Sequence, residues 1–531
     1  MPRRRSLYRS RSHSASGRGF AAFVLLMVLL TGGVIVWRTG LLGFGGGGQA
    51  SATGPTGRPP GPFDSERPTE SPTPSPSPSP TIEGGGPINP DFPNLTTFRG
   101  NATRTYYGEG PFPKNPTVRW TYPSSGGLCS VSDGGSGPKT WCGTGWTGQP
   151  NVIEKPNGSV EIRIGAYDAH YHFLAGRSGE PVRPDLVTGD LAKGSATSDP
   201  DGYPLYYAGS RDNQLRVVAL DRPEPTELWS IDANTSVPDP TWNDDWDGAP
   251  LIIGDYLLEG GENSWFYVIK LNRGYDGAGK VTVDPTVVLT VPGYDDQLIQ
   301  DLGDTDISIE SSVAFFDGVA YFSNSGGLVQ GWDLHDILRG GTEATRVFRY
   351  WVGDDVDATI AIDQQGYLYV ARHKEHNVTS RVNPFAGSLG NLVKLDPRKR
   401  QKPVVWSAWI GSSSGGGDIL GTPALYEGYV YIGSVDGELT AVNMKNGRKA
   451  WSETLPGPLN ASPVVIDDRL LMGDCLGGLH LYDVSDPTAS PRKLWTLQLE
   501  GCVESTPAVW KGWIWVGTRA GPIYGIADPG A

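Results

Sequence analysis

Three acidic residues stand at equivalent places in three successive segments of the chain. Asp247, Glu310 and Asp357 each lie three residues before the start of a short apolar run. If the loops that carry them open on one face, the three carboxylates converge there. Ca²⁺ takes about six to eight oxygen ligands from Asp, Glu, carbonyl groups and water. The spacing therefore suggests a site for a hard cation or a basic ligand, with these residues as candidate metal ligands.

A second interpretation of the same acids stays open. Asp is common just before a strand because its side chain accepts hydrogen bonds from nearby backbone N–H groups, so turn formation or plain solvation also explains the pattern. The histidines add no metal motif: His373 and His376 are three residues apart in a long insertion, have no evident partners, and are interpreted as surface residues.

The four cysteines allow three pairings. Cys129 and Cys142 bracket a glycine-rich loop, so a local disulfide is expected between them. Cys475 and Cys502 fall in loops expected on the same face of neighbouring repeat units, and a bridge between them would join those units with about 2–4 kcal/mol of stabilisation. Free structural thiols are the alternative for all four.

These residues are set in a repeated unit. In the last third of the chain, three residue types recur at intervals of 40 to 45 residues, at Pro423, Pro463 and Pro507, at Gly433, Gly473 and Gly517, and at Trp406, Trp451 and Trp495. Each unit reads as four short strands separated by turns. A period of about 40–45 residues with four strands is typical of a β-propeller blade.

Fainter copies continue upstream. The position of Gly433 is matched by five earlier residues, which are Gly165, Gly209, Gly260, Ser323 and Ala371. Together with the three clear units these copies make eight. The fold class predicted from the sequence is therefore all-β, an eight-bladed β-propeller.

The ring is expected to close through the N-terminal part of the domain. The last unit ends without a fourth strand, and the segment "TVRWTY" around Trp120 can supply it, which would remove an open sheet edge. Tryptophans in the fourth strands are expected to dock between adjacent blades, since a buried indole removes roughly 150–250 Å² from water. The candidate docking residues are Trp120, Trp229, Trp351, Trp406, Trp451 and Trp495.

The segment "AVNMKNGRKAW", Ala441 to Trp451, resembles the tryptophan-docking motif A-x-D-x-x-T-G-x-x-x-W of the pyrroloquinoline-quinone (PQQ) repeat, with Asn443 and Asn446 at the Asp and Thr positions. Phe98 to Tyr122 also resembles the lead-in to PQQ-like propellers. The likeness covers roughly residues 98–528. It implies a PQQ-like propeller, a family that contains quinoprotein dehydrogenases as well as scaffold members such as the assembly factor BamB.

The resemblance leaves the activity open. Quinoprotein alcohol dehydrogenases of this family often carry two adjacent cysteines that cap the quinone, and they use Ca²⁺ beside it. This chain has neither a Cys-Cys pair nor a C-x-x-C-H haem motif. The expectation is a protein without a cofactor, and the alternative is an enzyme that binds PQQ and Ca²⁺.

The N-terminal part predicts a membrane anchor. Residues 1–19 form a basic, cytoplasmic tail, and the uncharged stretch 20–37 is just long enough to cross a bilayer as a signal-anchor helix. Residues 38–94, rich in Gly, Ser, Thr and Pro, are expected to form a stalk. The propeller is assigned to residues 95–531. Cleavage after "ASA" at residues 50–52 is the competing interpretation.

Charge narrows the choice of partners. The chain carries a formal charge of −14, and residues 1–38 hold seven positive charges and no negative one, so the rest carries −21. A domain this acidic repels nucleic acid and favours cations or basic partners. The sequence therefore predicts a single-pass cell-membrane protein whose extracytoplasmic propeller is a scaffold for an envelope protein. The alternatives are a quinoprotein oxidoreductase, and a sensor or carbohydrate-binding surface.

Overall fold

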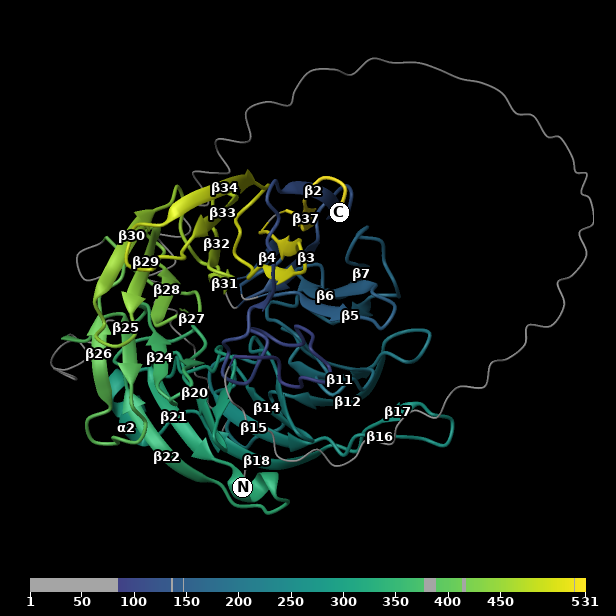
Figure 1. Ribbon diagram of the computed structural model, residues 1–531. Helices are drawn as coiled ribbons and strands as arrows, with labels where there is room; N and C mark the ends of the chain where they lie inside the picture. Colours follow the sequence, from purple (N-terminus) through teal and green to yellow (C-terminus); the bar gives the residue numbers. More distant parts are fainter. Residues whose placement is uncertain (1–84, 135–136, 147, 377–387, 413–416, 520) are drawn as a thin grey trace, which may run out of the picture. The chain divides into compact units, whose positions relative to one another are not determined.

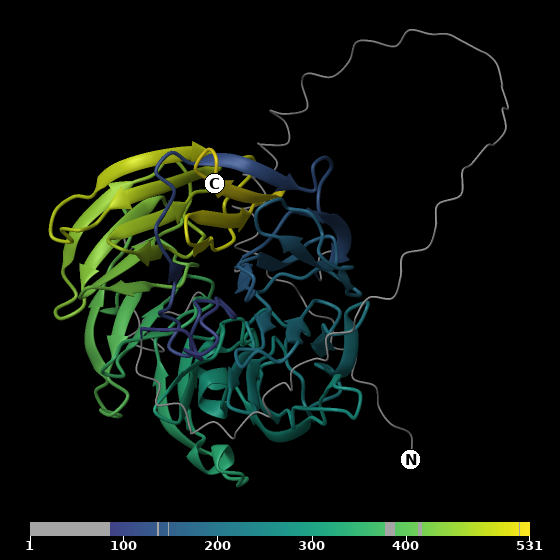
Figure 2. The same ribbon diagram turned by 45° about the vertical axis from the view of Figure 1, so that its right-hand side comes forward.

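Eight sheets surround a common centre in the computed structural model (Figures 1 and 2), seven of four antiparallel strands and one extended to five by a short parallel strand, which confirms the predicted eight-bladed β-propeller. The structure describes residues 85–134, 137–146, 148–376, 388–412, 417–519 and 521–531, and all of them belong to one compact unit, Pro78–Ala531. Among these residues no helix is long and apolar enough to span a bilayer. The predicted anchor, residues 20–37, lies outside the described residues and stays a prediction.

In each blade the chain runs from the innermost strand outward. Blades 1 to 4 consist of β5 (Asn151–Glu154), β6 (Val160–Ala166), β7 (His170–Ala175) and β8 (Leu186–Val187); β9 (Thr197–Ser198), β10 (Leu205–Gly209), β11 (Gln214–Ala219) and β12 (Thr226–Asp232); β13 (Leu251–Ile253), β14 (Tyr256–Gly260), β15 (Trp265–Lys270) and β18 (Thr286–Pro292); and β19 (Ala314–Phe316), β20 (Val319–Phe322), β21 (Leu328–Asp333) and β22 (Thr345–Trp351).

Blades 5 to 8 follow the same order. They consist of β23 (Ala361–Ile362), β24 (Leu368–Ala371), β25 (Leu392–Leu395) and β26 (Val404–Ala408); β27 (Ala424–Tyr426), β28 (Tyr429–Gly433), β29 (Glu438–Asn443) and β30 (Lys449–Thr454); β31 (Val464–Ile466), β32 (Arg469–Gly473), β33 (Gly478–Asp483) and β34 (Arg492–Gln498); and β35 (Ala508–Trp510), β36 (Trp513–Gly517), β37 (Ile523–Ala527) and β2 (Thr117–Tyr122).

The remaining described elements are small additions to the ring. They are β1 (Gly108–Glu109), which pairs in parallel with β35, the hairpins β3 (Cys129–Asp133) with β4 (Pro138–Cys142) and β16 (Gly274–Tyr275) with β17 (Val281–Thr282), and the helices α2 (Asp296–Leu302) and α3 (His335–Leu338).

The N-terminal strand closes the ring as the sequence predicted. Strand β2 pairs antiparallel with β37 and becomes the outer strand of blade 8. Trp120 of β2 donates a hydrogen bond from Nε1 to the carbonyl oxygen of Gly176 in blade 1, at 2.9 Å. A Cβ at Gly179, whose φ is +73°, would lie 2.6 Å from the Trp120 ring. The indole therefore packs flat on a glycine turn of the next blade.

Where a glycine stands at the repeated position of the second strand, it lies in the contact between blades; Ser323 and Ala371 take this position in blades 4 and 5. A Cβ at Gly433 would lie 2.6 Å from Met472 of blade 7. At Gly473 it would lie 2.3 Å from Val503, which leads into blade 8. Side-chain contacts this short do not occur, so only glycine lets adjacent blades approach to this distance.

The other candidate docking tryptophans lie at the same strand position, with one exception. Trp406 donates from Nε1 to the carbonyl oxygen of Met444 in blade 6, and Trp495 donates to that of Pro113, both at 3.0 Å. Trp451 is buried and Trp229 is half-buried. Trp351 instead donates to Gly326 of its own blade, and Phe348, opposite Gly331, takes the equivalent position in blade 4. The docking position accepts another aromatic ring, so counting tryptophans misplaced this one.

Both expected disulfides are present. Cys129 pairs with Cys142 across the β3–β4 hairpin, and Cys475 pairs with Cys502 between blade 7 and the start of blade 8. Among the described residues no cysteine is free. The second bridge therefore joins the last two blades of the ring.

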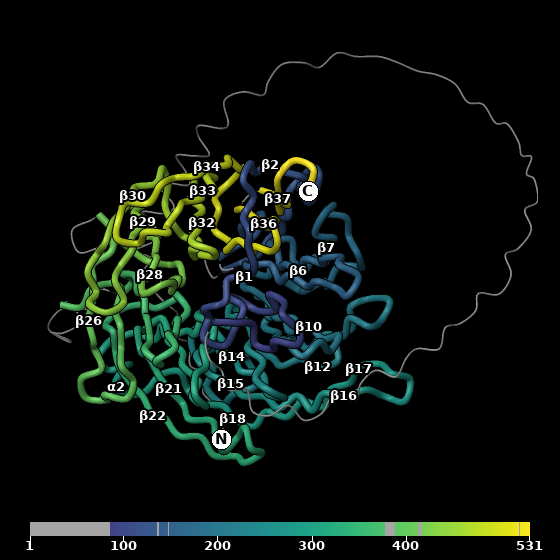
Figure 3. Tube along the Cα trace, viewed as in Figure 1, coloured from purple at the N-terminus to yellow at the C-terminus, as the bar shows by residue number. Residues whose placement is uncertain are grey.

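Residues 94–107, here called the channel plug, form a loop segment within the ring (Figure 3, purple). Backbone hydrogen bonds tie Leu95, Thr96, Ala102 and Thr103 to the innermost strands of blades 1, 2, 4 and 5. Side chains complete the contacts: Arg104 reaches blades 3 and 4, and Arg99 reaches blades 6 and 7. Since β1, which follows the plug, pairs with β35 of blade 8, this N-terminal segment contacts all eight blades.

Candidate functional site

The loops that lead into the innermost strands meet at one end of the ring, here called the channel mouth. In blades 2 to 8 these loops carry Lys193, Asp247, Glu310, Asp357, Leu420, Asn460 and Glu504 at the equivalent position. Thr147, the residue of blade 1, lies outside the described residues. Of the three predicted metal ligands, Asp247 is buried and Glu310 and Asp357 are half-buried.

The three predicted acids do not form one common cluster. Burial and the neighbouring carboxylates of Asp357 and Glu262 raise the pKa of Glu310 well above its usual range. The Glu310 carboxylate accepts a hydrogen bond from Ser308 Oγ at 2.9 Å. Asp247 and Asp357 each belong to a different buried group on either side of it.

The first group is centred on a lysine. Lys193 Nζ lies 3.1 Å from Asp245 and 2.9 Å from Glu262, and it also forms an ion pair with Asp247. Arg211 Nε adds a second cation 2.6 Å from Asp245. Burial alone would lower the pKa of Lys193, but Asp247, Glu262 and Asp245 outweigh it and raise the pKa well above its ordinary value.

This arrangement does not fit Ca²⁺. A calcium ion would need these carboxylates as ligands, but they already pair with the Lys193 ammonium group. The ion would have to displace that positive charge. Lys193 stands at the equivalent position of blade 2 in the sequence, but the repeat pattern does not show that its side chain reaches across to the acids of blade 3. In the structure Asp247 is therefore an ion-pair partner of Lys193.

Replacing Lys193 by methionine should turn this group into a calcium site. The substitution leaves Asp245, Asp247 and Glu262 close together without their ammonium partner, so oxygen ligands become free. Ca²⁺ at ten times its Kd should then raise the free energy of unfolding of the variant by about 1.4 kcal/mol. Urea unfolding with Ca²⁺ and with EDTA measures the difference. The native chain should show no such increase, and the absence of one in the variant would contradict the assignment.

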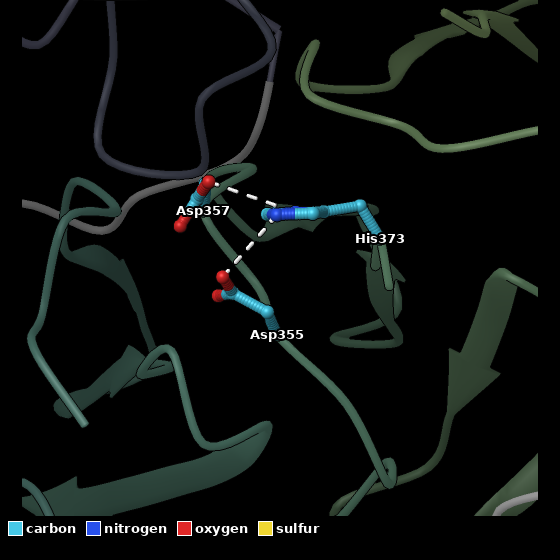
Figure 4. Close-up of side chains that lie close together, drawn as sticks. All are labelled: Asp355, Asp357 and His373. Carbon is cyan, nitrogen blue, oxygen red and sulfur yellow. Dashed lines mark ion pairs between the residues drawn. The ribbon is translucent and has the colours of Figure 1, made fainter. Parts of the chain in front are cut away.

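The second group is centred on a histidine (Figure 4). The His373 imidazole lies between Asp355 and Asp357, with Nε2 3.3 Å from Asp355 Oδ2 and Nδ1 3.6 Å from Asp357 Oδ2. Nε2 is also 3.6 Å from Glu375 Oε2. Burial opposes the charged imidazole, but Asp357 and Glu375 raise the pKa of His373 to about 9. His373 and His376 are thus largely buried, and their interpretation as surface residues was wrong.

A small cavity of about 10 Å³ lies at the mouth between His373 and Trp409, which is room for about one water molecule. A cavity of about 1010 Å³ lies at the other end of the ring, where the innermost strands turn into the second strands, and includes Tyr107, Tyr367 and Tyr426. The channel plug separates the two, because it is bonded to the strands between them.

An eight-bladed β-propeller with a plugged channel is thus the class that the fold and the site define. A family model described as outer membrane protein assembly factor BamB matches residues 349–497 and, in an overlapping match, 388–528. The BamB of Marinobacter adhaerens is 31% identical over 101 residues, which are 19% of this chain and 24% of that protein. The chain therefore spans about a quarter of the length of the curated relative it matches. The predicted resemblance to PQQ-like propellers is confirmed.

Solved structures with the same fold include a protein named as BamB and proteins named as dehydrogenases. BamB from Moraxella catarrhalis matches with a TM-score of 0.50 at 14% identity, over 71% of this chain and 95% of that one. A europium-containing methanol dehydrogenase matches with a TM-score of 0.55 at 12% identity, over 82% and 98%. A quinohemoprotein alcohol dehydrogenase from Pseudomonas putida gives 0.53 at 11%, over 82% and 80%. At these identities the likeness concerns the fold alone.

Proposed function

We propose that this propeller is a protein-binding or assembly scaffold of the cell envelope, held at the membrane by residues 20–37 as a single-pass anchor with the propeller on the extracytoplasmic side. The observation that carries the proposal is the surface of the channel mouth. Trp242 is 56% exposed in the loop that leads into blade 3, and Trp409 is 39% exposed in the loop that leads into blade 6. Exposed tryptophans are characteristic of protein-binding hot spots.

Other apolar side chains lie on the same face. Leu476 is exposed in the turn between β32 and β33, and Val131 in the β3–β4 hairpin. The innermost strand of each blade begins at the channel mouth, and because the strands of a blade alternate in direction, the second and the outer strands finish there. These residues therefore surround the mouth. The acids of the mouth lie between them. A suitable partner is therefore an envelope protein that presents apolar and basic side chains.

The alternative, a quinoprotein oxidoreductase that uses PQQ and Ca²⁺, has less support. The carboxylates around Asp247 are held by Lys193. Neither disulfide joins adjacent cysteines. The relatives named as BamB support the scaffold, and those named as dehydrogenases support only the fold.

A photo-crosslinking residue placed at Trp409 in the full chain tests the scaffold. In intact envelopes it should capture one defined protein, which should then bind the purified chain directly. The combined substitutions Trp242→Ser and Trp409→Ser should weaken that binding at least about tenfold, because hot-spot residues carry most of the binding energy.

Val405 on β26 is the matched control, since it is equally exposed on the outer rim. A crosslinker at Val405 should not capture the partner, and Val405→Ser should leave the affinity unchanged. Equal capture from both positions would contradict the docking face. Dye-linked oxidation of an alcohol or a sugar after addition of PQQ and Ca²⁺ would favour the quinoprotein instead.

A further inference from the structure

Residues 85–94 follow the turns between innermost and second strands, at the end of the ring opposite the channel mouth. The Asn94 side chain accepts a hydrogen bond from the backbone of blade 1 at 2.8 Å, and Asn89 donates one to a turn of blade 2 at 2.9 Å. Ile88 packs against the apolar cluster shared by blades 3 and 4. A Cβ at Gly85 would lie 3.9 Å from a side chain in the corresponding turn of blade 5. From Asn94 back to Gly85, the segment therefore passes blades 1 to 5 in order.

The cavity of about 1010 Å³ lies next along the same path. Gly85 is one of its lining residues, and the others come from blades 5, 6 and 7 and from residues 105–108. Four half-buried tyrosines contribute to the lining, namely Tyr106, Tyr367, Tyr426 and Tyr429. The volume is at the upper end of the roughly 300–1,000 Å³ found for ligand pockets. Blades 5 to 7 therefore have room for a further stretch of chain like the one that follows blades 1 to 4.

The buried amine in the cavity wall is already paired. Lys394 Nζ lies 3.3 Å from Asp363 and donates a hydrogen bond to the carbonyl oxygen of Met444 at 3.1 Å. It also lies 4.1 Å from the centre of the Tyr367 ring, within the range of a cation–π interaction. The interior of the cavity thus offers aromatic rings, and its buried charge needs no ionic ligand.

The chain that reaches the cavity at Gly85 is rich in proline. Residues 78–84, with the sequence PSPTIEG, directly precede it and lie outside the described residues. Proline-rich segments favour the polyproline II conformation, which has no internal hydrogen bonds, so its carbonyl groups can accept them from tyrosine hydroxyl groups. Aromatic-lined grooves bind such segments at a low cost in entropy, because the conformation is formed in advance. The composition of these residues therefore suits a tyrosine-lined cavity.

We infer that residues 78–84 bind in the tyrosine-lined cavity over blades 5 to 7, as a continuation of residues 85–94 in the same chain. Because they are joined to the cavity wall at Gly85, their effective concentration there is on the order of 1 mM. An intrinsic Kd of about 0.1 mM would then keep them bound about 90% of the time. The inference concerns the end of the ring opposite the proposed docking face and does not depend on the scaffold function.

Digestion of the purified full chain with a glutamyl endopeptidase tests the docking. Glu83 lies within the segment and Glu70 lies before it in the same proline-rich region. Relative to free peptides of the same sequences, cleavage after Glu83 should be about tenfold slower than cleavage after Glu70. Tyr367→Ser combined with Tyr429→Ser should abolish this difference. Tyr350→Ser, which changes a half-buried tyrosine of β22 outside the cavity, is the matched control and should preserve it.

Variants of the segment itself keep the test independent of the folding of the propeller. Pro78→Gly combined with Pro80→Gly should speed cleavage after Glu83 about tenfold, because the segment loses its polyproline II preference and its contacts with the tyrosine rings. The matched pair Pro72→Gly with Pro74→Gly makes the same changes outside the segment and should leave that rate unchanged.

A photo-crosslinking residue at Tyr367 of the full chain identifies the occupant. It should join to residues 78–84 of the same chain at every protein concentration. A crosslinker at Lys511, in the equivalent turn of blade 8, should not. Equal relative cleavage after Glu83 and Glu70 in the native chain would overturn the inference. So would failure of either the tyrosine pair or the Pro78/Pro80 pair to speed cleavage, or crosslinks from Tyr367 to another protein alone.

Discussion

Replacing Arg104 by methionine should lower the free energy of unfolding of the propeller by about 3–5 kcal/mol. Arg104 is fully buried in the channel plug and donates hydrogen bonds to the carbonyl oxygens of Val313 and Ala249, in two different blades, at 2.6 and 3.1 Å. It also interacts electrostatically with Glu259, a buried carboxyl group whose pKa burial raises well above its usual range and which has no hydrogen-bond partner among the described residues. The methionine would leave all of these groups unpaired.

Urea unfolding of the full chain at neutral pH measures the loss. Arg119→Met, an exposed arginine on β2, is the control and should change stability by less than about 0.5 kcal/mol. Combining Arg104→Met with Glu259→Leu should recover part of the loss, because replacing both buried partners by apolar side chains is often close to neutral. A double variant no more stable than Arg104→Met would show that Glu259 is not the reason for the effect.

The ring was predictable from the sequence because every blade has to pack against its neighbours in the same way. The second strands of blades 6 to 8 approach their neighbours closely, which requires Gly433, Gly473 and Gly517, and most outer strands present a bulky side chain to the next blade. Such constraints repeat at a fixed period and are therefore visible in one sequence. Trp351 and Phe348 show the limit, since any large aromatic ring satisfies the outer position.

The channel plug was not predictable in the same way. It is tied to the ring mainly through backbone carbonyl groups, such as those of Pro423 and Pro463 that accept hydrogen bonds from Arg99. Every residue has the same backbone carbonyl, whatever its side chain. These contacts therefore impose no pattern of residue types on the blades. The only signal was two arginines, Arg99 and Arg104, in an otherwise uncharged stretch.

The sequence identified acids at the channel mouth, but it did not show which side chains they pair with. Choosing acids at equivalent positions led to Asp247, Glu310 and Asp357, although their cationic partners are Lys193, one blade earlier, and His373, which follows a second strand. Contacts between loops of different blades have no fixed spacing. A lysine at the same repeat position as the acids was the one sign in the sequence of paired carboxylates.

Replacing Trp120 by alanine should destabilise the ring by about 3–5 kcal/mol, the range for a buried tryptophan. Trp120 is 9% exposed, its ring fills the space above Gly179 of blade 1 and beside Gly525 of blade 8, and its Nε1 donates to Gly176. It is the one docking side chain that lies on the strand closing the ring. Losing it weakens the contact between the N-terminal strand and the first and last blades together.

Two further variants test whether the loss of stability comes from the closure of the ring. Trp229→Ala removes the same side chain from a half-buried position within blade 2 and should have a clearly smaller effect. Trp120→Phe keeps an aromatic ring over Gly179 but loses the hydrogen bond to Gly176, so most of the stability should remain. Limited proteolysis should cut Trp120→Ala between β1 and β3 faster than either of these variants. Equal losses for Trp120→Ala and Trp229→Ala in urea unfolding would mean that the closing strand is held by its backbone pairing with β37, and that the docked indole adds little.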